Sequence, residues 1–244
     1  MERVKTKLLG FDIDTFDFET AVSYAVDLIS SSKGGQVVTI NPEMIENGLK
    51  SPYFAKILND ADLVIPDGVG VKIGLKLKGA EAQRIAGIEF SHRLVSECAK
   101  NNYPIALVGA KPEIINKAAE NLKSEFENLE IVYIQDGYFK DTERVLQELA
   151  QSEPRFVLVA LGSPKQEEFI LEARKLLPSA LMIGVGGSFD VWSGVVERAP
   201  EVYQKMGLEW LYRTVKEPSR FKRIFPTLPR FLLRVVADKF KREV

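Results

Sequence analysis

Short runs of consecutive apolar residues alternate along most of the chain with longer segments whose apolar positions recur at helical spacing. Continuous apolar runs are typical of strands that are buried on both faces, as in a parallel sheet. The runs that predict strands are residues 7–13, 36–40, 62–65, 104–109, 130–134, 155–162 and 180–186. The pattern therefore predicts an α/β fold, a Rossmann-like parallel sheet with helices on both faces.

The segments between these runs predict the crossover helices. Proline is tolerated in the first turn of a helix, where its missing N–H does no harm. The expected helices begin near Phe18, Pro42, Ile88, Pro112, Thr142 and Pro164. The alternation stops near Ala199, after which helical stretches are interrupted by prolines and no strand pattern appears. We therefore predict a core over residues 1–198 and a C-terminal helical appendage over residues 199–244.

Composition narrows the class of protein. The 244 residues are 45% hydrophobic, enough to build a core. The only cysteine is Cys98 and the only histidine is His92, which excludes a disulfide framework and a zinc site built from Cys and His. No apolar run of about 18 residues is present, so no transmembrane helix is expected. These features suit a cytoplasmic protein and leave peripheral membrane attachment open.

Charge is distributed unevenly along the chain. The net charge is −1, yet residues 216–244 carry nine Lys/Arg against three Asp/Glu. The rest of the chain carries 24 basic and 31 acidic residues. A basic tail on an acidic body indicates an anionic partner for the tail.

Polar and glycine residues follow the predicted strands, and ligands bind beyond the carboxyl ends of strands in an open parallel sheet. These residues are Thr39, Asn41, Asp67, Gly109, Lys111, Gly162, Ser163, Lys165, Gln166, Gly186 and Gly187. We expect them to gather at one rim, with Asp67 on the floor of a site. A plain turn would also explain Pro-Asp-Gly at 66–68, and loop packing would explain the glycines at 184–187.

The glycine-rich loops fit phosphate binding only in a general way. Backbone N–H groups at a helix N-terminus favour an anion. The chain lacks both sharper nucleotide signatures, the G-x-x-x-x-G-K-[ST] loop and a G-x-G-x-x-G that opens a helix after the first strand. Asp12 and Asp14 form an Asp-x-Asp pair that could hold a divalent cation, but they lie beside a predicted helix cap, Asp17, and we expect no metal site. His92 falls inside a predicted helix, which favours a structural role.

A series of ordered motifs resembles one family. The motifs are TINPEMI, ADLVIPDGVGV, RIAGIEF, LVGAKP, DGYF, ALGSPKQE, GVGGSFDVWSGVVERAP and GLEWLYRTVKEPSRFKR. In this order they resemble the WecG/TagA/CpsF glycosyltransferases, glycosyltransferase family 26, from about Leu8 to Arg223. The closest branch resembles the N-acetylmannosaminyltransferases of wall teichoic acid linkage-unit synthesis.

The resemblance implies a reaction. It is an inverting transfer that needs no metal ion or cofactor, from a UDP-sugar to a polyprenyl-diphosphate-linked saccharide at the inner face of the bacterial membrane. In the closest branch, N-acetylmannosamine passes from UDP-N-acetylmannosamine (UDP-ManNAc) to undecaprenyl-diphosphate-N-acetylglucosamine, giving a β-1,4 link. Branches that use UDP-N-acetylmannosaminuronic acid or UDP-glucose share most of these motifs and stay open as alternatives.

The same resemblance implies residue roles. Asp67 would be the catalytic base, and Thr39 and Gln166 would hold the donor sugar or the acceptor. Arg84 and Lys165 would meet the diphosphate, and Gly186 and Gly187 would let the backbone close on the nucleotide. The appendage would supply further cations, Arg213, Arg220 and Arg223. One departure is Gln135, which stands where some members carry a histidine before DGYF.

Two other functions compete. An NAD-dependent oxidoreductase would suit the fold, but its glycine fingerprint is missing. A nucleotide- or nucleic-acid-binding module would explain the basic tail, yet the body is acidic and the tail is also apolar. On a helical wheel an apolar side of Leu232, Leu233, Val236 and Phe240 lies apart from Arg230, Arg234 and Lys241, which predicts an interfacial helix on the inner membrane leaflet and no nucleic-acid partner. Packing of this helix on its own core or on a second copy in a homodimer stays open.

Overall fold

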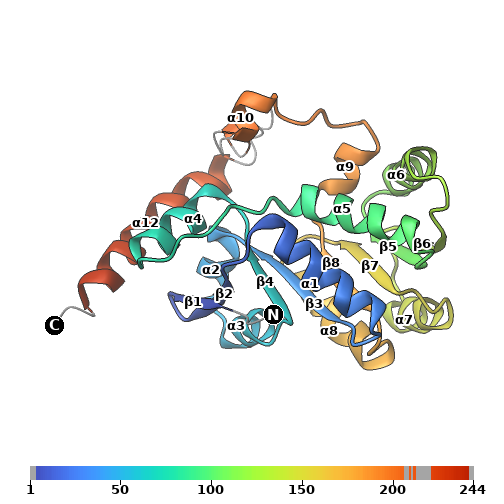
Figure 1. Ribbon diagram of the computed structural model, residues 1–244, viewed down its shortest axis with the longest axis horizontal. Helices are drawn as coiled ribbons and strands as arrows, with labels where there is room; N and C mark the ends of the chain where they lie inside the picture. Colours follow the sequence, from blue (N-terminus) through green and yellow to red (C-terminus); the bar gives the residue numbers. More distant parts are fainter. Residues whose placement is uncertain (1–3, 206–208, 210, 213–220, 242–244) are drawn as a thin grey trace.

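The fold is a six-stranded parallel sheet covered by helices on both faces (Figure 1), as predicted. The computed structural model describes residues 4–205, 209, 211–212 and 221–241. The strand order is β4-β3-β8-β7-β5-β6, and every neighbouring pair is parallel. The strands are β3 (Gly35–Ile40), β4 (Leu63–Pro66), β5 (Ile105–Gly109), β6 (Ile131–Gln135), β7 (Phe156–Ala160) and β8 (Leu181–Gly184).

Helices cover the two faces in separate layers. One face carries α1 (Phe18–Ser30), α5 (Gly87–Lys100) and α6 (Pro112–Glu125). The other carries α2 (Pro42–Gly48), α3 (Pro52–Asn59), α7 (Thr142–Gln151) and α8 (Lys165–Leu176). The remaining helices are α4 (Val69–Leu77), α9 (Ser188–Trp192), α10 (Glu201–Lys205) and α12 (Phe221–Lys241). The short helices α3 and α4 were not among the predicted elements.

Strand β4 shows why the apolar runs are continuous. Leu63 and Ile65 pack with α1 and α5, whereas Val64 between them packs with α2 and α3. All three are almost completely buried. Burying each such side chain contributes about 1.5–3 kcal/mol, so a strand between two helical layers has no position at which a polar side chain is favoured.

Side-chain caps define where several helices begin. Asp17 accepts from the Thr20 N–H at 2.7 Å, and Asn41 accepts from the Met44 N–H at 3.0 Å. These bonds satisfy backbone donors that lack a partner within the helix. Pro42 and Pro112 stand in the first turns of α2 and α6, as expected, whereas Pro164 is the residue that precedes α8.

The prediction for residues 7–13 was wrong, because this run is not a strand of the parallel sheet. It divides into an antiparallel hairpin of β1 (Lys5–Leu8) and β2 (Phe11–Asp14). The turn residues Leu9 and Gly10 both have positive φ, 51° and 93°, which matches the right-handed twist of a two-residue hairpin.

The two aspartates of this hairpin have separate structural contacts. Asp14 is fully buried and accepts from the Val64 N–H of β4 at 2.8 Å. Asp12 lies 3.7 Å from the Lys7 ammonium. Among the residues described, no cluster of three or more His, Cys, Asp or Glu could hold a metal ion.

Helix α12 packs on its own core, against α2 and α4. Phe231 and Val235 are fully buried in the cluster that also holds Leu8. The close approach needs Gly74 of α4, since a Cβ there would lie 2.9 Å from Leu8 Cδ2 and 3.5 Å from the Phe231 ring.

Two ion pairs also tie α12 to the core. The Arg234 Nε lies 3.0 Å from the buried Glu46 Oε1 on α2. The Lys78 ammonium lies 2.5 Å from the Asp238 Oδ2. The contacts of α12 therefore combine buried apolar side chains with charge pairs.

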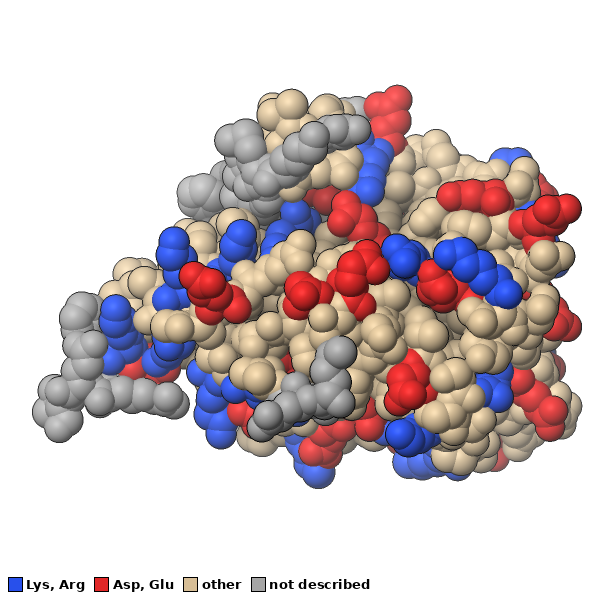
Figure 2. All heavy atoms as spheres, viewed as in Figure 1, with Lys and Arg blue, Asp and Glu red and all other residues tan. Residues whose placement is uncertain are grey.

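The docked side of α12 differs from the apolar side expected on the helical wheel. Phe231 and Val235 make the docking contact, while Leu233 is 72% exposed and Val236 is 42% exposed. The side chains of Phe240 and Lys241 lie outside the described residues. Lys and Arg gather over the end of the molecule formed by α4 and α12 (Figure 2). Within the described part of the chain, no helix is both long and apolar enough to cross a bilayer.

Phe231→Ala is expected to lower the free energy of unfolding by about 3 kcal/mol, because it removes a fully buried ring between α12 and α4. Leu233→Ala, on the exposed side of the same helix, should change it by less than about 0.5 kcal/mol. Urea unfolding followed by circular dichroism measures both values. Equal effects of the two substitutions would contradict the docked position of α12.

Candidate functional site

A cavity of about 500 Å³ opens at the carboxyl ends of four adjacent strands, β4, β3, β8 and β7. This is where polar groups collect, because each chain segment leaves the two buried faces at that edge. Nine of the predicted site residues line the cavity: Thr39, Asn41, Asp67, Arg84, Gly162, Ser163, Gln166, Gly186 and Gly187. The lining also includes residues from the C-terminal part of the chain, Glu209, Thr227 and Leu228.

Asp67 follows β4 directly and is fixed by the backbone on both sides. Its own N–H donates to the Ile40 carbonyl at 2.9 Å, which extends the β3–β4 pairing by one step. Gly68 then adopts φ +84° as the N-cap of α4, a conformation that favours glycine. The Pro-Asp-Gly sequence at 66–68 therefore does make a turn, and that turn places Asp67 in the lining of the cavity.

The Asp67 carboxylate has few partners. Its Oδ1 lies 3.8 Å from the Arg84 Nε, and its Oδ2 accepts a long bond of 3.5 Å from the Gly87 N–H. Burial raises the pKa of Asp67 above its ordinary value, although Arg84 and the Gly87 and Gly68 N–H groups oppose this. The charge of Glu209 raises the pKa further. A carboxylate of raised pKa is a stronger base than an ordinary aspartate.

Thr39 and Asn41 lie on the neighbouring strand end. Thr39 contacts Gly87 so closely that a Cβ on the glycine would lie 3.0 Å from its Cγ2. Asn41 has a structural task, because its Oδ1 caps α2. Both residues line the cavity near Asp67.

Gln166 is held in one orientation by groups at both ends of its amide. The Gly186 N–H donates to Oε1 at 3.2 Å, and Nε2 donates to the Glu167 Oε1 at 2.7 Å. Gly184 leaves room for this arrangement, since a Cβ there would lie 2.3 Å from Nε2. Glu167 is almost fully buried, and burial raises its pKa, opposed by hydrogen bonds from Gln166 and Ser163. The loops after β7 and β8 are therefore joined through one side chain.

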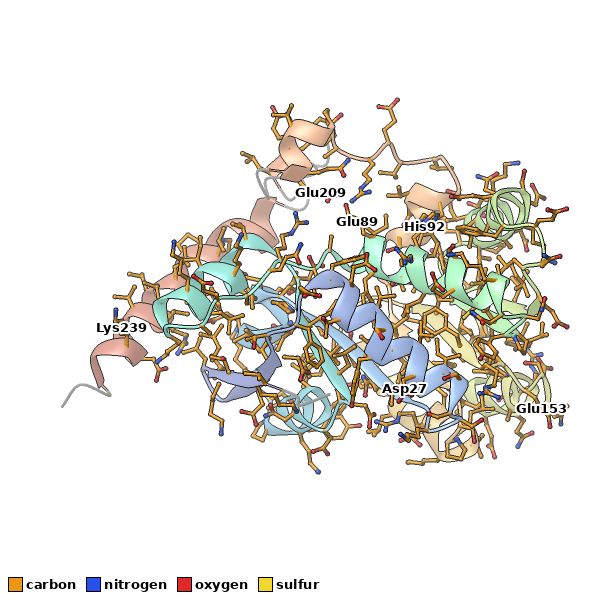
Figure 3. The ribbon with its side chains drawn as sticks, in the orientation of Figure 1. Asp27, Glu89, His92, Glu153, Glu209 and Lys239 are labelled. Atoms are coloured by element: carbon orange, nitrogen blue, oxygen red, sulfur yellow. The ribbon has the colours of Figure 1, made fainter. Side chains whose placement is uncertain are left out.

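A chain of charges runs from Asp67 towards the C-terminal part of the molecule. Arg84 faces both Asp67 and Glu209, and its Nη2 lies 3.6 Å from the Glu209 Oε2. Arg198 pairs with Glu209 at 3.9 Å and also with Glu89. Figure 3 labels Glu209 near α10 and Glu89 at the start of α5.

Three predicted binding residues do not line the cavity. Gly109 ends β5 and Lys111 follows it, and this strand lies beyond β7. Gly109 is needed for packing, because a Cβ there would lie 2.3 Å from the Ala160 carbonyl oxygen. Lys165 is exposed in the first turn of α8. Arg213 and Arg220 lie outside the described residues, as does the side chain of Arg223.

Glu43 and Glu209 line the cavity although they were not predicted as site residues. Both belong to motifs that were recognised, NPE and GLEWLYR, so their signal was position within a motif. Spacing alone does not show that Glu209 approaches Arg84, because about half of the chain separates the two.

His92 and Cys98 take no part in the cavity. The His92 Nε2 lies 3.0 Å from the Glu125 Oε2, and its ring contacts the rings of Phe126 and Trp192. Cys98 is fully buried within α5, and burial raises the pKa of its thiol to about 12. Neither side chain lies where it could act as a nucleophile, or activate one, in the cavity beside Asp67.

Comparison with known proteins agrees with this geometry. Residues 6–244 match the model of the Glycosyl transferase WecG/TagA/CpsF family. A protein of Bacillus spizizenii strain W23 is 38% identical over 209 residues, which are 85% of this chain and 81% of that protein. One of Bacillus subtilis strain 168 is 37% identical over 212 residues, 86% of this chain and 82% of that protein. Both are named N-acetylglucosaminyldiphosphoundecaprenol N-acetyl-beta-D-mannosaminyltransferase. The chain therefore belongs to the WecG/TagA/CpsF family of glycosyl transferases.

Proposed function

We propose that this protein transfers N-acetylmannosamine from UDP-ManNAc to the N-acetylglucosamine of an undecaprenyl-diphosphate acceptor, with inversion and without a metal ion. The names of the two Bacillus relatives support the acceptor and the transferred sugar. The observation that carries the proposal is Asp67, a carboxylate of raised pKa that faces a cavity at the carboxyl end of the sheet.

Asp67 serves as the general base in a single displacement. The acceptor hydroxyl oxygen attacks the anomeric carbon, its proton passes to the Asp67 carboxylate, and the bond to the UDP oxygen breaks on the opposite face. One displacement inverts the anomeric configuration. General-base assistance of this kind contributes roughly 10²–10⁴-fold to the rate.

The departing diphosphate needs more positive charge than the described residues that line the cavity supply. The charged groups described around the cavity are three acids, Glu43, Asp67 and Glu209, and one cation, Arg84. Arg84 already faces two of those acids. We therefore assign charge stabilisation to Arg213, Arg220 and Arg223 together with the Gly187 N–H, since the Gly186 N–H already donates to Gln166.

Thr39 and Gln166 complete the proposed site. Thr39 contributes a hydroxyl close to Asp67 on the adjacent strand end, suited to a hydrogen bond with a sugar hydroxyl. The fixed amide of Gln166 offers its remaining donor and acceptor capacity towards the cavity. Both residues would orient donor and acceptor for in-line attack.

The enzyme works at the inner face of the membrane, where its lipid acceptor resides. Leu233 and Val236 of α12 and Ile73 of α4 are exposed apolar residues. Lysines and arginines gather over the end of the molecule that these two helices form (Figure 2). Each basic residue near an anionic surface contributes about 1 kcal/mol of binding free energy. This composition suits a peripheral attachment in which α12 keeps its docked side on the core.

The reaction itself is tested by incubating the full chain, in excess EDTA, with an undecaprenyl-diphosphate-GlcNAc analogue and one of three donors. UDP release is expected with UDP-ManNAc and not with UDP-N-acetylmannosaminuronic acid or UDP-glucose. Preference for another donor would overturn the donor assignment. Activity that returns only on adding Mg²⁺ or Mn²⁺ would overturn the metal-independent mechanism.

Asp67→Asn is expected to lower kcat by about 10²–10⁴-fold while donor affinity changes by no more than about threefold, because the amide cannot accept a proton. In the unchanged enzyme, kcat should fall as pH drops through the raised pKa of Asp67, above the usual aspartate range. Asp60→Asn, an exposed aspartate of the α3 end, is the matched control. Near-normal turnover of Asp67→Asn in steady-state kinetics would make Asp67 a turn residue only.

Membrane attachment is best tested by point substitution, because removing α12 would also remove Phe231 and Val235 from the core. Leu233→Ser combined with Val236→Ser should reduce co-sedimentation with anionic vesicles at least about tenfold, since it removes exposed apolar area without touching the docked side. Leu176→Ser, at an exposed leucine of α8, serves as control. Equal sedimentation of all three proteins would argue against attachment through α12.

A further inference from the structure

Each nitrogen of the Arg84 guanidinium lies near a different partner. Nε lies 3.8 Å from the Asp67 Oδ1, Nη1 donates to the Gln204 carbonyl at 3.1 Å, and Nη2 lies 3.6 Å from the Glu209 Oε2. Two of the three partners come from the C-terminal part of the chain. By these distances, Asp67 is the most distant of the three partners. The guanidinium does not form with Asp67 the two parallel hydrogen bonds that it commonly makes with a carboxylate.

Burial and two neighbouring guanidinium groups hold Glu209 in this position. It is 8% exposed and lies between two guanidiniums, with the Arg198 Nε 3.9 Å from its Oε1. Arg198 is in turn held by Glu89 of α5. Glu209 thus competes with Asp67 for Arg84, and Arg198 keeps Glu209 in place for that competition.

We propose that Glu209 is a positioning residue, which holds Arg84 away from a full ion pair with Asp67 and so keeps Asp67 able to accept the acceptor's proton. This rests on the proposed function of Asp67 as the base. A bidentate Arg84–Asp67 pair would stabilise the ionised carboxylate and weaken it as a base. The C-terminal part of the chain would thereby tune a catalytic group that lies on the core.

The charges around Asp67 permit this assignment. On the described elements that surround it, the ionisable groups lining the cavity are Arg84, Glu209 and Glu43 of α2. The N–H groups of Gly68 and Gly87 also stabilise its charged form. Arg84 is the only cation among these, so after burial itself its charge has the largest effect on how readily Asp67 gains a proton.

Glu209→Gln keeps the size of the side chain and removes its charge. It should lower kcat about tenfold and move the acid limb of the kcat–pH profile to lower pH by about one unit, because Arg84 turns to Asp67. KM for the UDP-sugar should change by no more than about threefold. Glu209→Asp keeps the charge and should hold the limb closer to that of the unchanged enzyme.

Asp238→Asn is the matched control. It removes the same charge from the C-terminal part of the chain and breaks an ion pair with the core, Lys78–Asp238, whose members do not line the cavity. Its acid limb should coincide with that of the unchanged enzyme. Thermal unfolding of all variants, recorded alongside, shows whether each remains folded at the assay temperature.

If Glu209→Gln lowers kcat but leaves the acid limb of the kcat–pH profile in place, Glu209 has only a structural role and the proposal is overturned. An unchanged kcat and limb would overturn it as well. Both results leave the proposed function standing if Asp67→Asn is inactive. If Asp67→Asn keeps its turnover, the base assignment itself fails, whatever Glu209→Gln shows.

Discussion

Burial of the parallel sheet on both faces is the constraint on which the rest of this molecule depends. Strands β3, β4, β5, β7 and β8 each pack one set of side chains against α1, α5 and α6 and the other set against the opposite helical layer, whereas the edge strand β6 is only partly buried. A polar side chain in the middle of such a strand would lose its hydration without gaining a partner. Chemistry is therefore confined to the segments that leave the sheet, and the cavity forms where four of these segments lie side by side.

This constraint explains how far the sequence could predict the site. Thr39, Asp67 and Gln166 lie at or after the ends of apolar runs, and the carboxyl ends of parallel strands share one edge of the sheet, where these three residues line one cavity. Gly109 and Lys111 satisfied the same rule, yet β5 lies beyond β7 and they do not line the cavity. Strand order comes from long-range pairing, which the local pattern does not contain.

Two further features could not be predicted from the local sequence pattern. The hairpin at the N-terminus looked like one strand because Leu9 and Gly10 interrupt the apolar run only briefly, and a turn with two positive φ values leaves little trace apart from the glycine. The sequence left open which side of α12 would pack on the core, because both Phe231 and Leu233 are apolar. Only the partner surface, with Gly74 on α4, decides which of them is buried. Neither decision can be made from one segment alone.

The buried carboxylate of Asp14 has a consequence for how two copies of this protein can meet. Strand β4 is at one edge of the sheet, and an edge strand offers unpaired N–H groups to any passing chain. The hairpin lies against β4, and Asp14 occupies its Val64 N–H. The Val64 N–H is therefore not available for pairing with a strand of another copy, which hinders extension of the sheet at this edge.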